Sequence, residues 1–169
     1  MTGFGKFGDV VENPTTFLVN ALQETVKECE VEIHLEHSEV VDVSIQDCDV
    51  AIESIYKKIA ISAKENPEDR HIVMNLGVAA RRPMFCLEAI GKNIKDFRFP
   101  DERGNQPLNE PIRASDTTDF KIECSLDLDK ACTTLITKGH NVQKSHDAGE
   151  YICNYTYFRS LECIDNHNK

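Results

Sequence analysis

The chain lacks long apolar runs, a leader-like N-terminus and an excess of positive charge. Its longest apolar runs are far too short to cross a bilayer, and residues 1–5 contain no apolar segment typical of a secretion signal. The formal net charge of −10 at pH 7 disfavours a general attraction to nucleic acid or to an anionic membrane surface. We therefore expect a cytoplasmic protein whose partners include neither nucleic acid nor membrane.

The cysteines fit neither a disulfide framework nor a metal site. Their number, seven, is odd, and no C-x-x-C pair occurs. This pattern favours a reduced set of thiols, most of which serve as small hydrophobic core residues. We accordingly expect no bound metal and no cofactor.

Length and composition fit one compact domain. The chain has 169 residues, of which 40% are hydrophobic, and no low-complexity tract or internal repeat interrupts it. These features predict a hydrophobic core rather than disorder. We therefore predict a single domain that covers residues 1–169.

Helical and strand patterns alternate along the chain. Helices are predicted at residues 14–27, 44–63 and 127–138 and from Cys153 to about residue 162. Strands are predicted at residues 30–35, 71–77, 84–89, 121–125 and 141–146. Residues 2–5 are predicted to form a loop after a first strand, and residues 96–116, rich in Pro, Gly and Asn, a longer loop.

The alternating order predicts the α/β class. The expected architecture is a doubly wound, mostly parallel sheet with helices on both faces, which gives three layers, α/β/α. Little sequence precedes the loop at residues 2–5, and little follows the last predicted helix. We therefore expect this sheet to be incomplete at both ends.

A candidate nucleophile stands where a predicted strand gives way to a predicted helix. Residues 147–155 read DAGEYICNY and place Cys153 in the first turns of that helix. A thiol near the positive end of a helix dipole ionises more readily, and the thiolate is the form that attacks a carbonyl carbon. The absence of a Gly-x-Cys-x-Gly elbow disfavours other α/β thiol hydrolases.

Three separated segments carry a family resemblance. They read TGFGKFG at 2–8 with NPT at 13–15; then LGV at 76–78, LE at 87–88, Asn93 and RFPD at 98–101 with Gly104; and finally SHDAGEYICN at 145–154. In this order and spacing they resemble the pyroglutamyl-peptidase I family. Its members are cysteine peptidases that remove an N-terminal pyroglutamate. The family usually has Pro at the position of Lys6. The resemblance implies that peptides with an N-terminal pyroglutamate are the substrates.

The resemblance also implies catalytic roles. Cys153 matches the family's nucleophile, and Glu88 matches the acid that orients the catalytic histidine. Cysteine-dependent amide hydrolysis requires a thiolate, a histidine that shares and returns the proton, and a third group that fixes the imidazole. From its surroundings alone, Glu88 would more often be an exposed strand residue, and its spacing from Gly77 favours the functional role.

The resemblance further implies a pocket for the pyroglutamyl ring. A flat, uncharged lactam gains from apolar faces and a few backbone hydrogen bonds. The matching residues are Phe4, Phe7, Val78, Arg98 and Ile152. Without the other motifs, the two phenylalanines would be core aromatics beside a glycine turn, and the arginine an exposed loop residue.

The family's histidine lies on a strand after the cysteine helix, usually in a His-Val-Pro context, and the printed sequence contains no such segment. We interpret the histidines that are present, at positions 34, 37, 71, 140, 146 and 167, as structural or solvated. General acid–base catalysis contributes typically ~10²–10⁴-fold. We therefore expect weak turnover or none from this chain.

Two hypotheses remain open at this stage. The first is a cytosolic pyroglutamyl-peptidase I-like domain that is short at the N-terminus and lacks the last strand and helix. The second is a non-catalytic relative, a splice or gene-model product that acts as a binding or scaffold protein. The oligomeric state stays open, with a homo-oligomer among the options.

Overall fold

The computed structural model describes residues 1–26, 33–80 and 82–167, and the chain divides into two compact units. Unit 1 comprises Met1–Val78 and Phe99–Asn105, and unit 2 comprises Ala79–Arg98 and Gln106–Lys169. The single domain over residues 1–169 stays a prediction. Among the described residues, no helix combines the length and the apolar content needed to cross a membrane.

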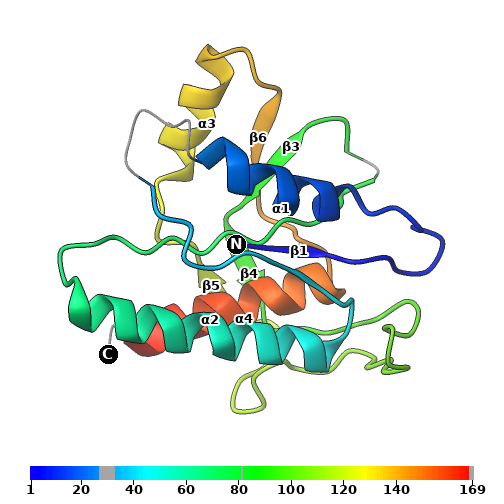
Figure 1. Ribbon diagram of the computed structural model, residues 1–169. Helices are drawn as coiled ribbons and strands as arrows, with labels where there is room; N and C mark the ends of the chain where they lie inside the picture. The colour runs from blue at the N-terminus through cyan, green and yellow to red at the C-terminus, as the bar shows by residue number, and fades with distance from the viewer. Residues whose placement is uncertain (27–32, 81, 168–169) are drawn as a thin grey trace. The chain divides into compact units, whose positions relative to one another are not determined.

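Unit 1 is built on a parallel pair of short strands. β1 (Thr2–Phe4) pairs with β2 (Glu39–Val41), so that Gly3 lies opposite Val40. The helix α1 (Pro14–Thr25) lies against β1, as Figure 1 shows. A Cβ atom at Gly3 would come within 2.6 Å of Val19 Cγ2 and 2.7 Å of the Thr15 carbonyl oxygen. Glycine therefore permits this close approach of strand and helix.

A capping residue precedes each helix of unit 1. The side chain of Asn13 accepts a hydrogen bond from the Thr15 N–H at 3.0 Å, and Pro14 occupies the first helical position. The longer helix α2 (Ile45–Glu65) begins after Ser44, whose hydroxyl accepts the Asp47 N–H at 3.1 Å. The predicted ranges for both helices are confirmed to within a few residues.

The strand predictions for unit 1 are wrong in several places, and strand β2 was not predicted. Residues 2–5, predicted as a loop, contain strand β1. The apolar run at residues 71–77 forms only an isolated parallel bridge between Thr2 and Asn75, although a central strand is predicted there. Of the strand predicted at residues 30–35, residues 30–32 lie outside the described residues, and residues 33–35 form no strand. Apolar runs do not specify strands unless a neighbouring strand pairs along their whole length.

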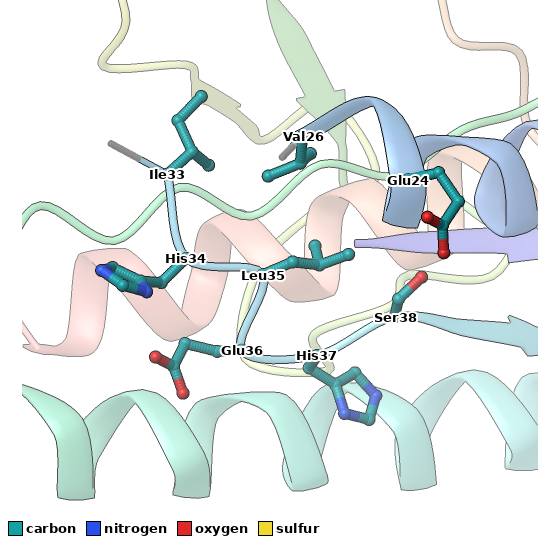
Figure 2. A pocket seen from close by; sticks show the side chains of 8 residues that line it. All are labelled: Glu24, Val26, Ile33, His34, Leu35, Glu36, His37 and Ser38. Atoms are coloured by element: carbon teal, nitrogen blue, oxygen red, sulfur yellow. The ribbon is translucent and has the colours of Figure 1, made fainter. Parts of the chain in front are cut away.

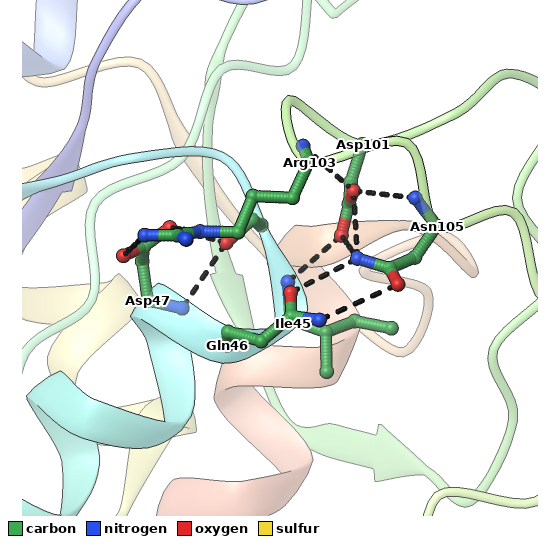
Figure 3. Close-up of polar contacts among 7 residues, drawn as sticks. Ile45, Gln46, Asp47, Asp101, Arg103 and Asn105 are labelled. Atoms are coloured by element: carbon green, nitrogen blue, oxygen red, sulfur yellow. Dashed lines mark hydrogen bonds and ion pairs between the residues drawn. The ribbon is translucent and has the colours of Figure 1, made fainter.

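A buried carboxylate anchors the segment Phe99–Asn105 to the start of α2 (Figure 3). Asp101 is 4% exposed and accepts hydrogen bonds from the N–H groups of Ile45, Arg103 and Asn105 at 2.8–3.0 Å. The Asn105 side chain also donates to this carboxylate. Burial alone would raise the pKa of Asp101, but these donors outweigh burial and hold the pKa below its usual value.

Unit 2 contains a parallel and an antiparallel pair of strands. β3 (Phe85–Glu88) runs parallel to β6 (Val142–Ser145), and β4 (Ile90–Lys92) runs antiparallel to β5 (Lys121–Glu123). Ala89 separates β3 from β4: its N–H donates to Ser145, and its carbonyl accepts from the Cys124 N–H. The chain therefore changes strand partner at Ala89, and the predicted strand at residues 84–89 misses β4.

The remaining secondary-structure predictions for unit 2 are confirmed. The helix α3 (Leu128–Thr137) begins after the capping residue Asp127 and is followed by Gly139, whose φ of +87° favours glycine. Helix α4 (Ile152–His167) follows β6 in the predicted order. Residues 96–116 contain no helix and no regular strand. The α/β class is confirmed by the helices and the two parallel strand pairs.

Candidate functional site

A buried asparagine fixes the first turn of α4 to β4. The Asn154 side chain is fully buried, accepts the Lys92 N–H at 2.9 Å, and donates to the carbonyl oxygens of Lys92 and Ile94, each at 2.9 Å. Ile152, on the same turn, is 1% exposed, whereas Cys153 is half-buried. The cysteine therefore stands on a helix start that Asn154 ties to β4 and the residues after it.

Helix α4 begins without negative charge in its first turn, which contains no acidic residue. The unopposed N–H groups of a helix N-terminus carry partial positive charge, which stabilises an anion placed there. Cys153 is the second residue of α4 and lies within this first turn. The placement predicted from the sequence is confirmed, and its chemical role stays a prediction.

Glu88 is the last residue of β3 and is half-buried. Its Oε1 atom lies 3.6 Å from Arg82 Nη1. Its Oε2 atom is buried and accepts no hydrogen bond from the residues that the structure describes. Buried polar atoms rarely lack a partner, and functional sites account for many of the exceptions. The Glu88 Oε2 atom is therefore suited to accept a hydrogen bond from the N–H group of another residue.

Tyr157 connects the Glu88 strand to the Cys153 helix. Its hydroxyl donates a hydrogen bond to the Glu88 backbone oxygen at 2.5 Å. Burial, and then the proximity of Cys124 and Glu88, raises the pKa of Tyr157, so the hydroxyl keeps its proton. Residues four apart share one face of a helix, so Tyr157 and Cys153 face the same way. Sequence reasoning missed this residue, although its spacing from Cys153 was a usable signal.

Two cations hold the loop at residues 146–151, which precedes α4. Lys92 Nζ lies 2.7 Å from Asp147 Oδ1, and Arg82 Nη2 donates to the Asp147 backbone oxygen at 2.8 Å. The same Oδ1 accepts the N–H of Gly149, whose φ is +82°. The Lys92 hydrogen bond is the main cause that lowers the pKa of Asp147, so this carboxylate stays ionised at neutral pH.

The sequence-predicted site residues fall into both units. Unit 2 contains Cys153, Glu88, Ile152 and the exposed Arg98, whereas unit 1 contains the predicted ring-binding residues Phe4, Phe7 and Val78. Phe4 is 4% exposed and belongs to the core of unit 1. Phe7 is half-buried and pairs with Val10 across a short bridge. The contribution of these residues to one pocket stays a prediction.

Two cavities have no predicted site residue among the residues that line them. One, of about 550 Å³ in unit 1, is lined by the side chains drawn in Figure 2, which come from the end of α1 and the segment before β2. The other, of about 240 Å³ in unit 2, is lined by Phe85, Leu87, Leu135, His140 and Val142. Within the described ranges, no group of three or more His, Cys, Asp or Glu residues is arranged to hold a metal ion.

Comparison with known proteins agrees with the motif pattern. The family model for pyroglutamyl peptidase matches residues 1–169. A pyrrolidone-carboxylate peptidase of Fusobacterium nucleatum is 31% identical over 159 residues, which cover 94% of this chain and 66% of the relative. The corresponding protein of Brevibacillus brevis is 29% identical over 158 residues, with coverage of 94% and 66%.

Solved structures show the same fold. The pyrrolidone carboxyl peptidase from Thermococcus litoralis superposes with a TM-score of 0.80 at 26% identity, over 99% of this chain and 69% of that one. A mutant pyrrolidone carboxyl peptidase of Pyrococcus furiosus gives a TM-score of 0.81 at 24% identity, over 99% and 73%. This chain therefore belongs to the pyroglutamyl peptidase family. It spans about two thirds of the length of the curated relatives that it matches.

Proposed function

We propose that this chain carries the nucleophile and the orienting acid of a pyroglutamyl-peptidase I, which removes N-terminal pyroglutamate from peptides. One arrangement carries the proposal: Cys153 stands in an acid-free first turn of α4, and Tyr157 on the same helix face binds the Glu88 backbone. The family assignment supports the same reaction class. We also propose a cytoplasmic location and, as substrates, peptides with an N-terminal pyroglutamate.

The proposed chemistry is acyl transfer through a thioester. The Cys153 thiolate attacks the pyroglutamyl carbonyl carbon, and the leaving amine takes a proton as the peptide bond breaks. Water then hydrolyses the thioester and releases pyroglutamate. By the family resemblance, a histidine handles these protons. Glu88 would orient its imidazole, and the buried, unpaired Oε2 atom is suited to receive the ring N–H.

The proposed ring pocket uses apolar faces. By the family resemblance, Phe4 and Phe7 would sandwich the lactam, Val78 would line the same pocket and Ile152 would sit beneath the ring. Arg98 would help to hold the oxyanion or the Glu88 loop. A lactam carries no charge, so selectivity must come from shape and from hydrogen bonds to its carbonyl and N–H. A proline-like ring has the same shape but lacks the ring carbonyl.

This difference provides the test. The chain is treated with pyroglutamyl chloromethyl ketone and, in parallel, with prolyl chloromethyl ketone, and the labelled thiol is located by peptide mapping. We expect the pyroglutamyl reagent to alkylate Cys153 at least ~10-fold faster, because a site that binds a substrate polar group rejects an analogue without it. A Cys153→Ala variant is the control. Equal rates, or labelling spread over other thiols, would contradict the proposal.

A turnover assay separates the two hypotheses of the sequence analysis. Pyroglutamyl-aminomethylcoumarin is offered to the 169-residue chain and to the chain extended by a strand with the His-Val-Pro pattern. A Cys153→Ser variant of each form is the control. We expect weak turnover or none from the 169-residue form. Strong turnover that the Ser variant abolishes would show that another histidine serves as the base, with His146 and His167 as the candidates.

A further inference from the structure

One guanidinium in unit 2 contacts both the predicted acid and the approach to the Cys153 helix. Arg82 Nη1 donates to Ser145 Oγ at 2.7 Å and lies 3.6 Å from Glu88 Oε1. Arg82 Nη2 donates to the Asp147 backbone oxygen at 2.8 Å. The two nitrogens of one side chain therefore reach the end of β3, the end of β6 and the start of the loop at residues 146–151.

The partners of Arg82 are themselves fixed. Ser145 is 6% exposed and lies directly opposite Glu88 in the β3–β6 register. Its hydroxyl also accepts the Asp147 N–H at 3.3 Å. Cys86, two residues before Glu88, receives a further hydrogen bond from Arg82 Nη1 at 3.2 Å. The planar fork of an arginine can make these contacts at once, whereas the point charge of a lysine cannot.

We propose that Arg82 is a positioning residue for the reaction proposed above, on which this inference rests. It holds the Glu88 carboxylate and the loop before α4 in one arrangement, so that Cys153 keeps its place relative to Glu88. A misplacement of about 1 Å in a reacting pair can cost ~10²-fold in rate. Arg82 therefore acts through Glu88 and the loop, without contact to the reacting atoms.

The chain offers a matched control for this role. Lys144, on β6, pairs with Asp129 on α3 at 2.7 Å, and its side chain is 32% exposed, close to the 31% of Arg82. Removing its charge deletes an ion pair in the same unit whose cation is as exposed as Arg82, although its acidic partner is more exposed than Glu88. K144Q therefore reports the effect of a lost surface cation, whereas R82Q also loosens the link between Glu88 and the loop.

The experiment compares wild type, R82Q, R82K and K144Q as full chains, at a temperature well below all their unfolding midpoints. Two rates are measured at Cys153: alkylation by pyroglutamyl chloromethyl ketone and alkylation by iodoacetamide. We expect R82Q to slow the directed reagent by ~10–100-fold and iodoacetamide far less. R82K should recover only part of the loss, and K144Q should match wild type. Hydrogen exchange at residues 146–151 should rise most in R82Q, less in R82K and not in K144Q.

The outcomes distinguish a positioning role of Arg82 from a merely structural one. Arg82 has only a structural role, and the inference is overturned, if R82Q slows alkylation by both reagents equally. The same conclusion follows if both alkylation rates of R82Q equal those of K144Q. Full recovery in R82K would also overturn it, because the fork geometry would then be irrelevant. Failure of the proposed function looks different: wild type itself would show no preference for the pyroglutamyl reagent.

Discussion

The first turns of α2 and α4 carry different side-chain chemistry. At α2, Ser44 caps the helix, Asp47 lies in the first turn, and the Asp101 carboxylate accepts the Ile45 N–H. At α4, the first turn contains no acidic residue and includes Cys153. Carboxylates thus neutralise the partial positive charge at the start of α2. No acidic side chain in the first turn of α4 does the same there, so its partial positive charge can stabilise a thiolate. One helix start serves the stability of unit 1, and the other is suited to chemistry.

The largest effect should follow from removing the charge at α2. Asp101→Asn leaves N–H donors of Ile45, Arg103 and Asn105 facing a neutral amide in a buried site. We expect the free energy of unfolding to fall by about 3 kcal/mol, because hydrogen bonds to charged groups are worth more than neutral ones. Urea unfolding measures it, with the exposed Asp69→Asn as control. A loss below that of the control would show that the carboxylate does not anchor α2.

A second effect should appear where α4 meets β4. A Cβ atom at Gly91 would lie 3.0 Å from Phe158 Cα and 3.1 Å from a Leu161 methyl group. Gly91→Ala should therefore destabilise the chain by about 2 kcal/mol through overpacking against helix backbone. Gly5→Ala is the matched control, since its nearest neighbour would lie at an ordinary 3.5 Å. Equal stability of the two variants would contradict the close approach of β4 and α4.

The pH dependence of stability should also reveal the acid groups at α2. Hydrogen bonds, above all from Arg103, lower the pKa of Asp47, and backbone and side-chain donors lower that of Asp101, each from an ordinary value of 3.8. A group with a lowered folded pKa stabilises the fold above its unfolded pKa, and this stability is lost as pH falls through the folded pKa. Stability should therefore decline as pH falls below about 4. Asp101→Asn should show a shallower decline, and an unchanged slope would refute the assignment.

The smallest effect concerns the loop before α4. The side chains of Lys92 and Asp147 are 22% and 60% exposed, so Lys92→Gln should cost about 0.5 kcal/mol or less. Hydrogen exchange at residues 146–151 should nevertheless rise, because Lys92 holds this loop. Lys144→Gln removes an ion pair of the same 2.7 Å length elsewhere in unit 2. If both variants affect the loop equally, Lys92 has no special part in holding it.

Local signals explain which parts of the fold could be predicted from the sequence. Asn13, Ser44 and Asp127 each mark a helix start, because a side-chain oxygen that satisfies free N–H groups is encoded within a few residues. Strands are less predictable, since their partners lie far along the chain. The apolar run at residues 71–77 pairs only at Asn75, and Ala89 changes partner in a way that no local pattern specifies.

The residues of the candidate site likewise differ in whether a local sequence signal identifies them. Cys153 was predicted from a helix start and a family motif, and Glu88 from the motif alone. Arg82 could not be found, because its contacts to Ser145 and Asp147 span 63 and 65 positions and depend on the β3–β6 register. Tyr157 lies four residues after Cys153, which was a usable signal, but its hydrogen bond to the Glu88 backbone depends on the tertiary packing of α4.

Competitive alkylation of the thiols tests most directly whether the start of α4 is the reactive one. The native chain is treated briefly with limiting iodoacetamide at neutral pH, and the labelled cysteine is identified by peptide mapping. The acid-free first turn of α4 predicts that Cys153 is labelled first. The strongest competitor is Cys86, whose sulfur lies 3.2 Å from the Arg82 guanidinium. Preferential labelling of Cys86 or Cys163 over Cys153 would contradict the account.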